Sequence, residues 1–289
     1  ETFRPSWSHD HNVSVSGGND NTKYALSFSD YIENGIFTNS SFDKKTAKVR
    51  VNQKVSKRVS FDATLNYANT TKKGVGTSGD QGRFNMLGQI LRARPTGGLR
   101  LTDEELLAEA IDPLEMESSE SLSQVNPIVQ AQAVSNTRRS EMWSGNIAVS
   151  VDFGKGFKLR SAAQYSHTTG RNYIFYNEGS KEAYRNSLKP YGQNQITVDH
   201  RWSNFNYLIY TMPKMKGNSL EVTVGHEVSG RNSDYLIGQS TDFPFDALGS
   251  NNLGLGATPS KVQSYYADKL LLSFFARANY NYADRFLLT

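Results

Sequence analysis

The chain has no cysteine among its 289 residues. Disulfide bonds, thiolate catalysis and cysteine-ligated zinc are therefore excluded, and the absence suits an oxidising compartment in which free thiols are a liability. The chain also lacks an apolar run of about 18 residues, which excludes transmembrane helices. Its 32 basic and 28 acidic residues are spread along the chain. No basic patch therefore indicates nucleic acid as a partner.

Low mean hydropathy does not by itself exclude a membrane protein. The mean hydropathy is −0.57, although aromatic residues make up 11% of the chain. A membrane-spanning strand turns alternate side chains toward lipid and toward a polar interior, which hides its hydrophobicity from such an average. The composition is therefore compatible with membrane-spanning strands.

The clearest pattern lies at residues 269–289, KLLLSFFARANYNYADRFLLT. Apolar residues such as Leu270 and Phe274 fall on one parity, while polar residues such as Arg277 fall on the other. This period of two is typical of a strand with one apolar and one polar face, whereas a helix would scatter these residues. The break at residues 282–285 predicts a tight turn into the next strand.

The same alternation recurs along the chain and predicts about ten antiparallel strands joined as a meander. Short turns alternate with longer loops, and the long ones are expected at residues 70–140, 170–193 and 229–260. Short turns on one side and long loops on the other are typical of outer-membrane barrels.

Two local features add to this prediction. Helical spacing of apolar residues predicts a helix at residues 81–94, and a capping box predicts another at residues 102–111. The apolar parity changes between Trp202 and Phe205, which predicts a β-bulge.

Three segments resemble the barrel domain of SusC/RagA-type TonB-dependent outer-membrane transporters: LLSFFARANYNYADRFLLT at residues 271–289, HNVSVSGGNDNTKYALSFSDYIENGI at 11–36 and VNQKVSKRVSFDATLNYA at 51–68. The resemblance covers nearly the whole chain. It implies an all-β fold, an antiparallel up-and-down transmembrane β-barrel of which this chain supplies part, with long extracellular loops and short helices in one of them.

The resemblance also implies how the chain is organised. Residues 1–289 are expected to be one partial barrel domain, an internal portion of a longer protein. The plug domain, the TonB box and the C-terminal strands of the family are expected to lie outside it.

The resemblance further implies a function in the outer membrane of a Gram-negative, Bacteroidota-type bacterium. The expected activity is energised import of glycans, oligosaccharides or peptides, not enzymatic catalysis. The expected partners are outer-membrane lipid, a SusD-like surface lipoprotein that closes over the loops, and TonB acting through the missing N-terminal region. The alternatives are a surface β-rich binding or adhesion protein and a passive outer-membrane channel.

Aromatic and charged residues give the candidate sites. An interfacial membrane girdle is expected at Tyr67, Tyr165, Tyr280 and Tyr282, which lie near strand ends. The charged residues of the opposite parity are expected to line a polar interior: Lys48, Arg50, Asp62, Lys158, Arg160 and Arg277. The loop aromatics that either stack on a sugar substrate or pack the loop are Tyr173, Phe175 and Tyr176.

Three other motifs are weaker indications of function. Residues 74–79 match a dinucleotide fingerprint but lack the strand–turn–helix context that it needs, so we predict a surface loop. His9 and His11 share a face without a third metal ligand, and His167, His200 and His226 are interpreted as isolated on separate strands. The sequence therefore predicts no catalytic, cofactor-binding or metal-binding residues and no cofactor.

Overall fold

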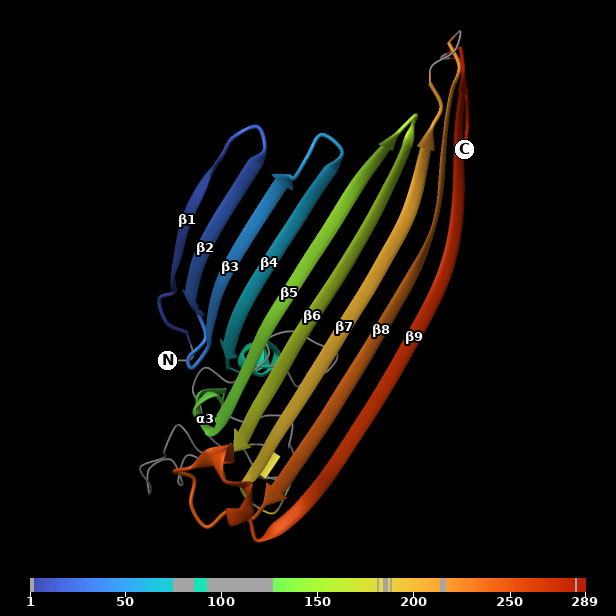
Figure 1. The fold of residues 1–289 in the computed structure, drawn as a ribbon. Helices are drawn as coiled ribbons and strands as arrows, with labels where there is room; N and C mark the ends of the chain where they lie inside the picture. The colour runs from blue at the N-terminus through green and yellow to red at the C-terminus, as the bar shows by residue number, and fades with distance from the viewer. Residues whose placement is uncertain are drawn as a thin grey trace, which may run out of the picture.

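A computed structural model describes residues 3–74, 86–92, 127–180, 182, 183, 187, 189–213, 217–283 and 285–289. These residues form one ten-stranded antiparallel sheet in which the strand order equals the sequence order (Figure 1). The all-β, up-and-down antiparallel fold expected from the alternation is confirmed. The sheet is open, with β1 and β10 at its two edges.

The strands are β1 (Trp7–Gly18), β2 (Thr22–Asn34), β3 (Ser41–Lys54), β4 (Val59–Lys73), β5 (Val134–Gly154), β6 (Phe157–Tyr176), β7 (Tyr191–Thr211), β8 (Ser219–Thr241), β9 (Thr258–Tyr282) and β10 (Phe286–Leu288). Short helices lie in the connections: α1 (Met86–Arg92), α3 (Pro127–Ala133), η3 (Gly249–Asn251) and η4 (Leu253–Leu255).

Short turns collect at one end of the sheet, the turn end, and long connections at the other, the loop end (Figure 1). Residue chemistry explains the turns. In the β1–β2 turn the Asn19 side chain accepts hydrogen bonds from the backbone N–H groups of Asn21 and Thr22, at 2.9 and 2.8 Å. In the β5–β6 turn Gly156 has φ +88°, and an added Cβ would lie 2.1 Å from the Thr211 carbonyl oxygen. Only glycine fits there.

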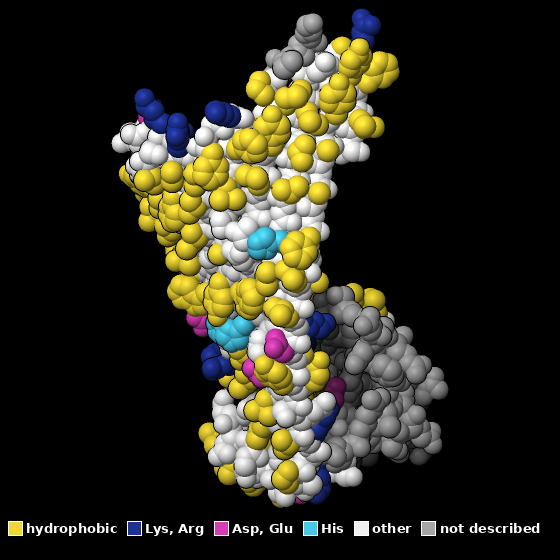
Figure 2. Space-filling view, turned by 45° about the vertical axis from the view of Figure 1, so that its right-hand side comes forward, with side chains coloured by type: hydrophobic (Ala, Val, Ile, Leu, Met, Phe, Trp, Pro, Cys, Tyr) yellow, Lys and Arg dark blue, Asp and Glu magenta, His cyan; other side chains and the backbone are white. Residues whose placement is uncertain are grey.

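The register gives the sheet two different faces. Leu26 lies opposite Val49, and Val49 lies opposite Leu65, so apolar residues of neighbouring strands share one face. We call it the apolar face, and its exposed members include Val13, Val15, Tyr24, Leu26, Phe28, Val49, Leu65, Trp143, Ile147, Tyr165, Trp202, Val224, Leu270, Leu272 and Phe274. Hydrophobic side chains cover much of the surface seen in Figure 2.

The other face, which we call the polar face, carries the charged residues that the sequence assigned to it. Lys48 lies opposite Ser27 and Asn66, and Asp62 lies opposite Asn52 and Ala148. Strand parity places on the same face Arg50, Lys158, Arg160 and Arg277. The alternation therefore predicted the division into two faces correctly.

The strands at the loop end are longer than the sequence predicted, so the expected loop bounds were wrong. β4 continues to Lys73 and β5 begins at Val134, and the next two long connections are residues 177–190 and 242–257. The apolar alternation stops where the apolar face ends, but the backbone hydrogen bonds that pair the strands do not depend on side-chain polarity. Polar residues therefore continue the sheet.

The predicted β-bulge between Trp202 and Phe205 is wrong. β7 pairs with β6 and β8 without a register shift from Tyr191 to Thr211. The parity changes because Asn204 and Asn206 lie on the apolar face, while Phe205 lies on the polar face with the following alternate residues. A change in polarity, not an extra residue, caused the pattern.

The helix α1 (Met86–Arg92) confirms the helix expected at residues 81–94 where that segment is described, whereas residues 81–85, 93, 94 and 102–111 lie outside the described residues. Among the described helices, none has the length and apolar character needed to cross a membrane.

Packing is tightest at the loop end. Most buried apolar side chains of the described residues lie there: Ala131, Ala133, Val134, Phe175, Ala183, Ile237 and Phe243. The rings of Phe175 and Phe243 meet edge to face at 5.3 Å and 76°. The loop-end connections therefore have a small core of their own, which fixes their positions at this end of the sheet.

Candidate functional site

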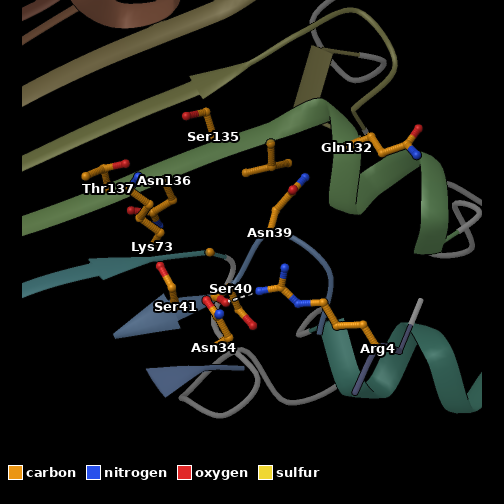
Figure 3. A pocket seen from close by; sticks show the side chains of 12 residues that line it. Arg4, Asn34, Asn39, Ser40, Ser41, Lys73, Gln132, Ser135, Asn136 and Thr137 are labelled. Carbon is orange, nitrogen blue, oxygen red and sulfur yellow. Dashed lines mark hydrogen bonds between the residues drawn. The ribbon is translucent and has the colours of Figure 1, made fainter. Parts of the chain in front are cut away.

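A polar cleft of about 340 Å³ lies at the loop end (Figure 3). The connection from β2 to β3, the end of β4, α3 and the start of β5 supply its walls. Its lining residues are Arg4, Asn34, Asn39, Ser40, Ser41, Lys73, Gly74, Gln132, Val134, Ser135, Asn136 and Thr137. The cleft therefore joins segments that are far apart in the sequence.

Side-chain hydrogen bonds to the backbone join the segments that form the walls of this cleft. Arg4 donates from Nε to the Gly35 carbonyl oxygen at 3.1 Å and from Nη2 to the Ser40 carbonyl oxygen at 2.6 Å. Asn39 has φ 61°, a conformation that asparagine tolerates better than most residues. Its Nδ2 donates to the Ala131 carbonyl oxygen at 3.0 Å and so joins the β2–β3 connection to α3.

The chemistry of the cleft suits a polar ligand. Arg4 and Lys73 bring positive charge to its wall. The Oδ1 atom of Asn136, which lines the cleft, is buried and has no hydrogen-bond partner among the described residues. Buried polar atoms normally have partners, so this oxygen can accept a hydrogen bond from a ligand or from water.

A second polar group lies on the polar face near the loop end, and we call it the mouth array: Tyr176, Tyr191, Gln193 and Gln239. The rings of Tyr176 and Tyr191 are 5.6 Å apart. Gln193 Oε1 accepts hydrogen bonds from the Tyr191 hydroxyl at 2.9 Å and from Gln239 Nε2 at 2.7 Å. Beyond the end of the apolar face, burial raises the pKa of the Tyr176 hydroxyl to about 12, and the Glu182 carboxylate adds to the shift. A tyrosine hydroxyl is protonated at neutral pH even without this shift, and the raised pKa extends its protonation to more alkaline pH.

The structure separates the three aromatic residues that the sequence placed in a loop. All three lie in β6, so the loop placement was wrong. Phe175 is 5% exposed and packs on Phe243, which is the loop-packing role that the sequence left open. Tyr173 has the parity of the apolar face, whereas Tyr176 has the parity of the polar face.

The four residues expected in a membrane girdle all lie on the apolar face. The Tyr67 ring lies 4.3 Å from that of Trp143, and Tyr165 lies directly opposite Trp202. Tyr280 and Tyr282 lie at the turn end of β9. Sequence reasoning did not assign Trp143 and Trp202 to the girdle, and strand parity places them on the same face, beside Tyr67 and Tyr165.

Some charges on the polar face form ion pairs, both within a strand and between strands. Asp199 is held between two arginines, with its carboxylate oxygens 2.6 Å from Arg201 Nε and 2.6 Å from Arg231 Nη2. Closer to the turn end, Arg160 lies 3.6 Å from Asp62. The polar face therefore carries hydrogen-bonded charges.

The interpretation of His167 and His200 as isolated was wrong, because β6 and β7 place them side by side with Nδ1 atoms 3.3 Å apart. A single strand does not reveal its pairing partner, so the sequence hid this contact. His9 and His11 share a face as expected, with stacked rings 5.9 Å apart. Residues 75–79 of the glycine motif lie outside the described residues. In the described part of the chain, no three side chains from histidine, cysteine, aspartate and glutamate are placed to hold a metal ion.

Comparison with known proteins supports the fold. No family model matches the chain. A curated relative, TonB-dependent receptor P3 of Formosa agariphila, is 21% identical over 96% of this chain and 27% of its own length. The chain therefore spans about a quarter of that relative.

Solved structures give the same fold. The RagAB peptide importer in the open-open state matches with a TM-score of 0.73 and 18% identity over 95% of this chain and 30% of that one. Its closed-closed state gives 0.70 and 17% over 94% and 30%. The siderophore receptor PiuA of Acinetobacter baumannii gives 0.54 and 11% over 94% and 38%. The chain thus has the fold of part of a TonB-dependent receptor barrel, and the resemblance to the SusC/RagA type is confirmed.

Proposed function

We propose that this SusC/RagA-type barrel segment is part of an outer-membrane TonB-dependent active transporter. One observation carries the proposal: an up-and-down sheet with one apolar and one polar face, which matches the RagAB importers over nearly its whole length. The apolar face then contacts lipid, and the polar face lines the barrel interior. No covalent chemistry is proposed for these residues.

The dimensions of the apolar face support the membrane placement. Phe157 and Tyr210 lie opposite each other near the turn end, and Tyr165 and Trp202 lie opposite each other nearer the loop end. The strand between Phe157 and Tyr165 is about 26 Å long at about 3.3 Å per residue, which a tilt of about 40° reduces to about 20 Å. The apolar band of outer-membrane barrels is about 25 Å tall, so the distance between these two aromatic levels is slightly less than the height of such a band.

We place the girdle roles accordingly. Tyr67 and Tyr165 contact the extracellular interface of the outer membrane, and Tyr280 and Tyr282 contact its periplasmic interface. The loop end then faces outward, as long loops do in outer-membrane barrels. The host is a Gram-negative, Bacteroidota-type bacterium, a source that the Formosa relative supports.

The partners follow from the same orientation. A SusD-like surface lipoprotein rests on the loop end, and TonB acts from the periplasmic side through a plug that belongs to the rest of the protein. The transported substrate is a glycan, an oligosaccharide or a peptide. The mouth array supports this class, since tyrosine faces and carboxamides bind the hydroxyl and amide groups of such molecules.

The test uses the whole protein in its own host. The gene is deleted and restored, and uptake of labelled oligosaccharides and peptides is measured in cells with and without a working TonB. We expect uptake to need both the protein and TonB. Uptake that persists without TonB would identify a passive channel, and surface binding without uptake would identify an adhesion protein. A protein found in the soluble fraction would overturn the membrane assignment itself.

A further inference from the structure

Two histidines from neighbouring strands meet on the apolar face, just beyond the aromatic pair Tyr165 and Trp202. His167 of β6 lies directly opposite His200 of β7, and their Nδ1 atoms are 3.3 Å apart. Their ring centroids are 4.6 Å apart, and both side chains are half-buried. The Nδ1 atoms of the two imidazoles therefore face each other across a short gap.

Two oxygen atoms complete the surroundings of this pair. The Tyr165 hydroxyl lies 2.9 Å from His200 Nδ1, and Thr169 Oγ1 lies 3.1 Å from His167 Nε2. A histidine that binds a metal commonly makes a hydrogen bond through its other ring nitrogen, which fixes the ring and its tautomer. Thr169 is placed to accept that bond and to leave the Nδ1 lone pair of His167 directed at His200.

The separation of the two nitrogens fits a shared metal ion. Two imidazole nitrogens that bind one tetrahedral zinc at about 2.0–2.1 Å lie about 3.3 Å from each other. Without a cation, two facing Nδ1 atoms require one of them to carry a proton, and the Tyr165 hydroxyl competes for the same His200 nitrogen.

We propose that His167 and His200 bind a divalent transition metal, zinc or copper, with the Tyr165 hydroxyl oxygen as a third ligand. Imidazole is a good ligand for both metals. The site lies on the opposite face from the mouth array and does not depend on transport.

The test uses the whole receptor, purified from membranes in detergent and stripped of metal with a chelator. Copper(II) is titrated in and followed by electron paramagnetic resonance. We expect one bound copper with hyperfine splitting from two nitrogens. His167→Gln and His200→Gln should each weaken binding by at least about 10-fold, since even outer-shell partners of a metal cost about 10- to 100-fold. Tyr165→Phe should weaken binding less and keep both nitrogen couplings.

Matched controls come from the same chain. His226→Gln removes a histidine of the apolar face that contacts Asn206 and Phe274, and His9→Gln removes one member of the stacked pair. Both variants should bind copper as the unchanged protein does, and heat-modifiable gel migration reports that every variant is folded. Unchanged affinity in the His167→Gln/His200→Gln double variant would overturn the proposal. An equal loss in His226→Gln, or no bound copper at all, would overturn it as well.

Discussion

At the scale of the residue, neighbouring positions of one strand have different roles because their side chains point to opposite faces. Tyr176 belongs to the polar face with the mouth array, whereas Tyr173 has the parity of the apolar face. We expect Tyr176→Ala to weaken substrate binding by about 2- to 10-fold, because an aromatic contact contributes about 0.5–1.5 kcal/mol. Tyr173→Ala should leave affinity nearly unchanged. Equilibrium binding of the transported oligosaccharide or peptide to the purified receptor measures both, and equal losses would contradict the assignment of faces.

The ion pairs are expected to differ in strength because their carboxylates differ in exposure and in number of partners. Asp199 is 12% exposed and joins two arginines, while Asp30 is 27% exposed and lies 3.4 Å from a single lysine, Lys45. Hydrogen bonds to charged groups contribute about 1.5–3 kcal/mol, and surface pairs contribute about 0–1 kcal/mol. Asp199→Asn should therefore lower the free energy of unfolding by more than Asp30→Asn. Urea unfolding of the whole receptor in vesicles compares them, and equal effects would show that Asp199 is no better shielded.

At the scale of the strand, the two faces have opposite tolerance for charge. Ile147 is 51% exposed on the apolar face, and Asn146, its neighbour in β5, lies on the polar face. A lipid-facing arginine costs about 2–4 kcal/mol near the middle of the bilayer. We expect Ile147→Arg to lower stability by that amount and Asn146→Arg to change it by much less. Unfolding from lipid vesicles is the measurement, and a larger loss for Asn146→Arg would reverse the proposed orientation.

Sequence reasoning succeeded where polarity follows backbone geometry. Alternation around Leu26, Val49 and Leu65 predicted the strands, their antiparallel order and their faces. It failed where polarity and geometry separate. Residues 170–176, the loop end of β6, were interpreted as loop, and the contact between His167 and His200 depends on a register that neither strand contains alone.

The segment of β7 in which a β-bulge was wrongly predicted, residues 202–205, shows a further limit of reading periodicity along a single strand. Ser161, Asn204, Asn206 and His226 form a polar cluster on the apolar face, in which Ser161 Oγ donates to Asn206 Oδ1 at 2.6 Å and Asn206 Nδ2 lies 3.4 Å from His226 Nε2. These side chains pair with one another, which lowers the cost of placing them toward lipid. Such pairing joins three strands, so a period counted along one strand reports it as an irregularity.

At the scale of the whole molecule, the exposed apolar face and the open edges determine what residues 1–289 can do by themselves. β1 and β10 each have a free edge, and unpaired backbone groups are not tolerated in the hydrocarbon region. We expect this polypeptide, expressed alone, to aggregate in water and to form no conducting pore. Single-channel recording in planar bilayers tests this prediction, with the whole receptor as control. Stable pores from the isolated polypeptide would require edge pairing between copies.

The order of the strands has a consequence for how such a protein changes over evolutionary time. Among the described residues, each of the ten strands of the sheet pairs only with its neighbours in the sequence order. A duplication or loss of one hairpin therefore keeps all the other strand pairs and both faces intact, because the parity of the remaining strands is unchanged. The circumference of a barrel built in this way can grow or shrink two strands at a time, while the packed connections at the loop end diversify independently.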